Sequence, residues 1–203
     1  MLHTESVYPK TLKLLKEIMA ESDLDFLSLV GGTSLALQIG HRISVDLDLF
    51  TSQTFDKNKV LNTLSKLGKT ENIIDQGYFL QLEINQIKID IVKYPYKFVD
   101  EPILIDKIRL LPIDKIAVMK LVAICNRGAK KDFVDIYFLL EKYSVSELVV
   151  LFENQFPQMN TLQLFKSMVY FDDADLQPDP IMIKSIDWQE IKNKIIQKMK
   201  DYL

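Results

Sequence analysis

Three short segments in the first half of the chain alternate apolar and polar residues, and this pattern constrains the fold more than any other. They span residues 45–50, 78–84 and 87–92. A period of two is typical of a β-strand that has one face in a hydrophobic core. Only Asn85-Gln86 separates the two later segments, so we expect a hairpin there. The sequence therefore predicts a sheet with one buried face and one polar face.

Helical spacing of apolar residues surrounds these strands and continues through the second half of the chain. It indicates helices near residues 9–20 and 55–67, and further helices from Pro112 to the C-terminus. Strands with intervening helices, followed by helices alone, predict an α+β fold with a small mixed β-sheet flanked by helices. We expect residues 1–110 to form the sheet-containing core and residues 111–203 a helical C-terminal part.

The composition excludes several classes of protein. The 203 residues include only two histidines and one cysteine, too few for a disulfide framework or a multi-histidine zinc site. The net charge of −3 means that nucleic-acid binding would need a local basic patch. No segment is apolar and long enough to span a membrane, and we do not expect the first residues to act as a secretory signal. We expect a cytoplasmic protein that does not associate with membranes.

Acidic residues stand on the polar face of the predicted strands. Asp46 and Asp48 lie two residues apart, so both side chains point to one face. Two ionised carboxylates repel each other unless a cation lies between them, and oxygen ligands favour Mg²⁺ or Mn²⁺. Asp90 is a candidate third carboxylate, with Glu83 as its rival, and three carboxylates can hold two metal ions. The alternative interpretation is a set of solvated acids on a polar sheet face.

A glycine pair precedes these carboxylates. Gly31, Gly32, Thr33 and Ser34 follow a short apolar strand and open a predicted helix. Glycines permit a tight turn and a close approach of a ligand, and the N–H groups at a helix N-terminus favour phosphate. Arg42 is a candidate to brace the aspartates or to contact a phosphate. The alternative is an ordinary junction between a strand and a helix.

A lysine interrupts the apolar helix of the second half. Lys120 lies in a run that is otherwise apolar from Ile116 to Cys125, and a lysine in such surroundings needs a partner or a ligand. Arg127 follows seven positions later and falls on the same helix face. One interpretation is a clamp for a triphosphate that reaches the metal site. The other is a buried salt-bridge network that joins the helical part to the sheet.

The segment GGTSLALQIGHRISVDLDLF resembles the AbiEii/AbiGii-type toxin nucleotidyltransferases of type IV toxin–antitoxin systems. The later segment MKLVAICNRGAKKDFVDIYFLL is similar to a second motif of that family, and the resemblance covers roughly residues 8–143. The family belongs to the DNA polymerase-β-like nucleotidyltransferase superfamily. The resemblance therefore implies a nucleotidyltransferase-like core followed by a helical part that contributes lysine, arginine and aspartate to the cleft.

The resemblance also implies an activity and a set of partners. It predicts the Mg²⁺-dependent transfer of a nucleoside monophosphate from an NTP to an acceptor, most plausibly the 3′ end of tRNA or another RNA. The protein would act as the toxin of a toxin–antitoxin or phage-defence system and would have a separate cognate antitoxin protein. The alternatives are a non-catalytic nucleotide- or partner-binding module with the same fold, and a nucleotidyltransferase whose acceptor is a protein or a small molecule.

The expected site combines residues inferred from pattern with residues inferred from the resemblance. The resemblance assigns the triphosphate to the glycine turn, the metal to the paired aspartates, and the nucleotide phosphates to a lysine on the helical part. The predicted catalytic residues are Asp46, Asp48, Asp90, Lys120 and Asp132, of which Asp46, Asp48 and Asp90 are the metal ligands. The predicted nucleotide-binding residues are Gly31, Gly32, Thr33, Ser34, Arg42 and Arg127.

Overall fold

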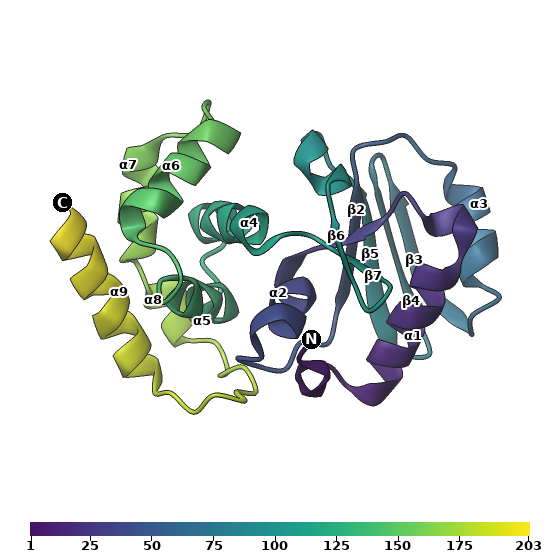
Figure 1. The fold of residues 1–203 in the computed structure, drawn as a ribbon, viewed down its shortest axis with the longest axis horizontal. Helices are drawn as coiled ribbons and strands as arrows, with labels where there is room; N and C mark the ends of the chain where they lie inside the picture. Colours follow the sequence, from purple (N-terminus) through teal and green to yellow (C-terminus); the bar gives the residue numbers. More distant parts are fainter. The chain divides into compact units, whose positions relative to one another are not determined.

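The structure is a computed structural model that describes all residues from 1 to 203. The chain divides into two compact units, Met1–Ile113 and Asp114–Leu203. The first contains a sheet with helices, and the second consists of helices (Figure 1). The predicted α+β class, with a mixed sheet followed by a helical C-terminal part, is confirmed.

The first unit is built around a seven-stranded mixed sheet in the order β3-β4-β5-β2-β1-β7-β6. Strands β2 and β5 pair in parallel, as do β1 and β7, and the other neighbours are antiparallel. The strands are β1 (Ser28–Leu29), β2 (Leu47–Thr51), β3 (Thr70–Gln76), β4 (Phe79–Ile84), β5 (Ile87–Lys93), β6 (Ile103–Ile105) and β7 (Ile108–Leu110). The helices are α1 (Pro9–Ala20), α2 (Gly31–Ile39) and α3 (Lys57–Leu64), with short 3-10 turns at Thr4–Ser6, Ser22–Leu24 and Lys97–Asp100.

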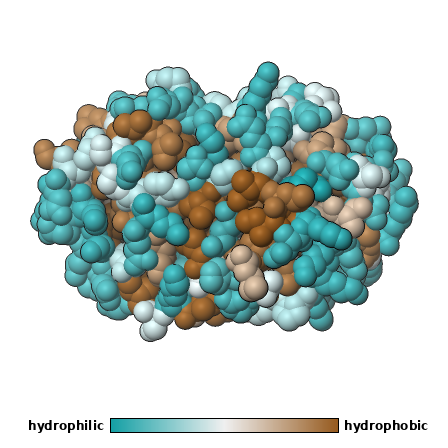
Figure 2. Space-filling model, viewed as in Figure 1, coloured by the Kyte–Doolittle hydropathy of each residue, from teal (hydrophilic) through white to brown (hydrophobic).

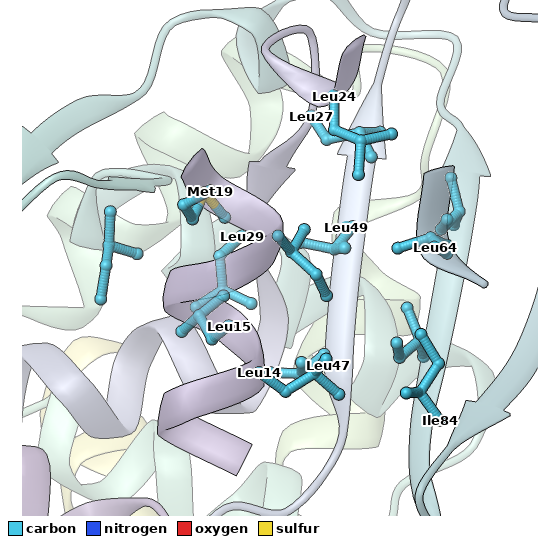
Figure 3. Close-up of a cluster of buried hydrophobic side chains, with 14 of the residues drawn as sticks. Leu14, Leu15, Met19, Leu24, Leu27, Leu29, Leu47, Leu49, Leu64 and Ile84 are labelled. Carbon is cyan, nitrogen blue, oxygen red and sulfur yellow. The ribbon is translucent and has the colours of Figure 1, made fainter. Parts of the chain in front are cut away.

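One face of this sheet is buried under α1 and α3. The alternating leucines and isoleucines of the central strands are completely buried and share one cluster with the apolar sides of both helices. Figure 3 shows Leu14 and Leu15 of α1 packed toward Leu47 and Leu49 of β2. Each such buried side chain contributes roughly 1.5–3 kcal/mol. Because side chains alternate along a strand, the acidic residues between these leucines point to the opposite face.

Two of the hairpins of the first unit turn through pairs of residues with left-handed backbone. Asn85 and Gln86 have φ angles of 50° and 67° and join β4 to β5, as the sequence predicts. A second pair, Asp106 and Lys107, has φ angles of 52° and 65° and joins β6 to β7. The sequence does not indicate this second turn, because no glycine marks it. Strand β3 is also unpredicted, since its residues are mostly exposed and do not alternate.

The second unit contains six helices. They are α4 (Ile113–Asn126), α5 (Lys130–Leu139), α6 (Val145–Gln155), α7 (Thr161–Met168), α8 (Asp172–Asp175) and α9 (Trp188–Tyr202). A capping box between Ser144 and Glu147 begins α6, and α9 packs a buried stripe against α5, α6 and α7. None of the helices in the chain has the length and apolar character needed to cross a membrane. Figure 2 shows that hydrophilic residues predominate on the viewed face, with apolar residues in smaller patches.

A buried ion network joins α4 to α5 within the second unit. The Lys120 ammonium lies 2.9 Å from Asp132 and 2.6 Å from Asp135, and all three side chains are buried. Arg127 adds a bidentate contact to Asp132 at 2.8 and 3.1 Å. Burial raises the pKa of Asp132, but the charges of Lys120 and Arg127 outweigh it and hold that pKa below the usual 3.8. Two cations therefore balance two carboxylates inside the helical unit.

The turn between β6 and β7 offers a test of the hairpin geometry. Lys107 is exposed and has a φ of 65°, a conformation that costs a residue with a side chain roughly 1–2 kcal/mol. Lys107→Gly relieves this cost, partly offset by the greater chain entropy of glycine, and should stabilise the protein by up to about 1 kcal/mol. Thermal unfolding measures the change. Lys107→Ala, which keeps the constraint, is the matched control and should give no gain; equal melting temperatures for the two variants would contradict the assigned turn.

The ion network of the second unit gives a second prediction. Lys120→Met leaves Asp132 and Asp135 buried without their shared cation, which should lower the free energy of unfolding by about 3–5 kcal/mol at pH 7. Arg127→Met should cost less, because the Arg127 side chain is 57% exposed. Urea unfolding provides the measurement.

The pH dependence of the Lys120→Met effect follows from the lowered pKa of Asp132. A depressed carboxyl pKa contributes stability above its unfolded value, and that contribution is lost as the pH falls through the folded value. The difference between wild type and Lys120→Met should therefore shrink below pH 3.8. A loss under 1 kcal/mol at pH 7 would contradict the role of this network.

Candidate functional site

The parallel pairing of β2 and β5 brings two predicted carboxylates side by side. Asp48 and Asp90 are register partners, on strands roughly 4.8 Å apart. Their neighbours Leu47 and Ile89 point into the core, so both aspartates lie on the face that α1 and α3 do not cover. Glu83 is one strand farther away, opposite Lys88. The structure therefore places Asp90, rather than Glu83, beside Asp48.

Asp46 lies immediately before β2 rather than inside it. The predicted strand begins at Val45, whereas the observed strand begins at Leu47. The residues that lead into β2 contact helix α2 instead. The Thr33 hydroxyl lies within hydrogen-bonding distance of the main-chain oxygen of Asp46 and 2.8 Å from Ser44 Oγ. The position of Asp46 thus depends on the glycine turn as well as on the sheet.

A lysine sits among the three carboxylates. Lys88 Nζ lies 2.8 Å from Asp90 Oδ2. Burial lowers the pKa of Lys88, but its hydrogen bond to Asp90 and the charges of Asp90, Asp46 and Asp48 outweigh it, so that pKa lies above the usual 10.5. Sequence reasoning missed this residue, although its position two before Asp90 on an alternating strand places it on the same face.

The other oxygen of Asp90 is buried and has no hydrogen-bond partner. A buried carboxylate oxygen without a donor costs free energy unless a cation or a ligand satisfies it. No group of three or more histidine, cysteine, aspartate or glutamate side chains in the structure is arranged to hold a metal ion. Magnesium sites in proteins commonly use one or two carboxylates and complete their shell with substrate phosphates and water. Two carboxylates of the set Asp46, Asp48 and Asp90 would suffice for that chemistry, and the use of all three stays a prediction.

The glycine pair forms the first turn of α2, directly against the carboxylate face. Gly31 has a φ of +66°, and a Cβ there would overlap Asp48 Oδ2. A Cβ on Gly32 would lie 2.5 Å from Nη2 of Arg42, whose side chain is buried. Helix α2 can begin at Gly31 because only glycine allows both the left-handed turn and the close approach of Asp48.

The two hydroxyl residues of this turn are used within the protein. Thr33 and Ser34 are both buried, and Ser34 Oγ lies 3.5 Å from the carbonyl oxygen of Leu111. Gln38 donates to the same carbonyl at 2.9 Å. These contacts fix the start of α2 to the neighbouring segments of the first unit. The N–H groups of the first helical turn, which lack intrahelical partners by the geometry of an α-helix, are the donors that this turn offers to an anion.

Aromatic side chains continue the carboxylate face. Phe50 follows Asp48 by two residues on β2, and Tyr94 follows Asp90 by four beyond β5, so both share its parity. Their ring centroids are 5.3 Å apart, and Tyr94 also contacts Tyr96 and Phe98. Burial, with the nearby Tyr96, raises the pKa of Tyr94 to about 12. The Tyr94 side chain is half-buried, and its hydroxyl is uncharged near neutral pH.

The remaining predicted residues lie close together within the second unit. Lys120, Arg127 and Asp132 lie in the second unit and are engaged with one another and with Asp135. Of the two interpretations of Lys120, a buried salt-bridge network is present, and within the second unit it joins α4 to α5. A role of these residues toward a nucleotide stays a prediction.

Comparisons with known proteins agree with this architecture. The family model of the nucleotidyl transferase AbiEii toxin, type IV toxin–antitoxin system, matches residues 13–202. The protein aq_aa25 of Aquifex aeolicus (strain VF5) is 33% identical over 190 residues, covering 86% of this chain and 87% of that relative.

Two solved structures share the fold. JHP933 from Helicobacter pylori has a TM-score of 0.59 at 19% identity, covering 96% of this chain and 92% of that chain. MenT4, the nucleotidyltransferase toxin Rv2826c from Mycobacterium tuberculosis H37Rv, has a TM-score of 0.55 at 14% identity. The match covers 96% of this chain and 86% of that chain. The family match spans both units and includes the glycine turn and the carboxylate strands. The resemblance seen in the sequence is thus confirmed: the chain belongs to the AbiEii nucleotidyl transferase toxin family of type IV toxin–antitoxin systems and is a nucleotidyltransferase.

Proposed function

We propose that the carboxylate face transfers a nucleoside monophosphate from an NTP to a hydroxyl group of an RNA, with the 3′ end of tRNA as the preferred candidate. The observation that carries this proposal is the register of Asp48 with Asp90 directly against the N-terminus of α2. Phosphate binding and carboxylate chemistry are thereby combined within the first unit. This is the combination that phosphoryl transfer requires, because positioning and charge neutralisation supply most of its rate.

The triphosphate would bind at the first turn of α2. The N–H groups of Gly31 and Gly32 and the positive end of the helix dipole favour an anion there. Arg42, whose guanidinium packs against Gly32, adds positive charge to this end. The hydroxyls of Thr33 and Ser34 act indirectly, by holding the turn in place.

Asp46, Asp48 and Asp90 would hold the divalent cation, Mg²⁺ or Mn²⁺. When bound, such a cation neutralises phosphate oxygens and lowers the pKa of an attacking hydroxyl. In the reaction the acceptor oxygen forms a bond to the α-phosphorus. The bond from that phosphorus to the bridging oxygen breaks, and pyrophosphate leaves. The proton of the acceptor hydroxyl passes to the Asp90 carboxylate. The α2 N-terminus and Arg42 stabilise the departing charge.

The family assignment also suggests the biological setting. We propose a toxin that acts in the cytoplasm, where NTPs and tRNA are found, and that is opposed by a separately encoded antitoxin protein. The alternative of a non-catalytic module predicts NTP binding without transfer. The alternative of a protein or small-molecule acceptor predicts transfer that does not label RNA. A panel of acceptors incubated with each radiolabelled NTP separates the three.

The carboxylates give the direct test of the proposed function. Asp46→Asn and Asp48→Asn preserve size but remove charge, so each should lower the labelling of total tRNA by radiolabelled NTP and Mg²⁺ at least about 100-fold. Asp173→Asn alters an exposed acid of the second unit and serves as the control. The proposal fails if wild type labels no RNA with any NTP, or if the two site variants label it as well as the control does.

The glycine turn gives an independent test. Gly31→Ala would place a Cβ against Asp48 in a left-handed position, whereas Gly77→Ala meets open space at a φ of +51°. Both should destabilise the protein by about 1–2 kcal/mol. Only Gly31→Ala should reduce nucleotide transfer, by about 10-fold or more, because it displaces a carboxylate. Equal transfer rates for the two variants would contradict the proposed role of the turn.

A further inference from the structure

A cavity of about 600 Å³ adjoins the carboxylate face within the first unit. Its walls come from three segments: the start of α1, the residues that lead into β2, and the turn between β4 and β5 with the first residues of β5. Asp46 and Lys88 belong to its wall, so the cavity opens beside the proposed reaction centre. Its volume lies in the range of roughly 300–1,000 Å³ that is usual for small-molecule sites.

The lining combines apolar, amide and cationic groups. Tyr8 and Val45 are 47% and 46% exposed, although both are large apolar residues beside a cavity. Gln86, exposed at the tip of the hairpin, adds an amide donor and acceptor. Lys10 adds a cation beside the carboxylate of Asp46, and Lys88, which is paired with Asp90, adds a second. This set suits a flat aromatic ring that carries hydrogen-bonding edges and an attached phosphate, and it disfavours a polycationic small molecule.

The sheet order fixes the side of the carboxylates on which the cavity lies. The central strands run β5-β2-β1, and α2 follows β1 directly, so its N-terminus lies on the β1 side of β2. The cavity is bounded by the residues that lead into β2 and by the beginning of β5, so it extends from β2 toward the side away from β1. In an in-line displacement the attacking oxygen and the leaving pyrophosphate stand on opposite sides of the phosphorus. With the triphosphate at α2, the acceptor must approach from the side of the cavity.

We propose that this cavity binds the terminal nucleoside of the acceptor RNA, with its base against Tyr8 and its hydroxyl presented between Asp46 and Lys88. This inference rests on the proposed function for the location of the triphosphate. It adds the acceptor site, with Tyr8 as the stacking residue and Gln86 as a group that contacts the base edge. Lys10 and Lys88 neutralise the phosphate that links the terminal nucleoside to the preceding one.

Binding measured without NTP tests this proposal separately from transfer. The probe is a single-stranded RNA of eight nucleotides with a fluorescent label at its 5′ end, compared with the same RNA whose 3′-terminal nucleotide lacks its base. Fluorescence anisotropy in Mg²⁺ should show that wild type binds the intact RNA about 5- to 20-fold more tightly. Tyr8→Ala should abolish this preference. The Tyr8 side chain makes no capping bond to α1, so the variant is expected to fold, and thermal unfolding checks this.

Matched variants and an NTP arm complete the experiment. Tyr8→Phe keeps the ring and should keep the preference, and Tyr78→Ala removes a tyrosine that is 69% exposed at the turn between β3 and β4 and should also keep it. The affinity for NTP, measured by calorimetry, should be the same in wild type and Tyr8→Ala.

Equal binding of both RNAs by wild type, or an undiminished preference in Tyr8→Ala, overturns the proposal. A loss confined to NTP binding assigns the cavity to the donor base and also overturns it. A base-dependent preference without any transfer upholds the cavity and refutes the proposed function alone.

Discussion

The parallel pairing of β2 with β5 is the constraint on which the rest of the first unit depends. Its register places Leu47 and Leu49 beside Ile89 and Ile91 on one face and Asp48 beside Asp90 on the other. A shift of one residue would bury the acids and expose the leucines, so the hydrophobic core fixes the position of the carboxylates. Stability and the geometry of the site therefore have the same physical cause.

Much of this arrangement follows from the sequence, but the partners of the strands do not. Period-two alternation identifies β2, β4 and β5 and the face on which their acids stand. It carries no information on whether β5 pairs with β2, since the two are about 40 residues apart and the connection contains a hairpin. For the same reason Asp90 and Glu83 are equivalent in the sequence and become distinct only through the register. The start of α2 at Gly31 depends likewise on the close approach of Asp48, which belongs to a different segment of the chain.

Lysines show a similar limit. Lys120 stands out in the sequence because it interrupts an apolar helix, yet its charge is balanced by Asp132 and Asp135 inside the helical unit. Lys88 does not stand out, because a lysine on the polar face of a strand is ordinary, yet it lies among the carboxylates of the site. Sequence patterns detect a residue that is unusual for its element. They do not detect an ordinary residue that tertiary structure places in an unusual electrostatic environment.

The two groups of charged residues differ in how completely their buried polar atoms are paired. In the second unit, Lys120 and Arg127 face two aspartates, and their positive and negative charges are equal. On the sheet face, Asp46, Asp48 and Asp90 are accompanied by Lys88 and by Arg42 across the glycine turn. Asp90 also retains a buried oxygen without a donor. A buried oxygen without a donor is costly to folding, and a cation held by the carboxylates, as the proposed function requires, would satisfy it.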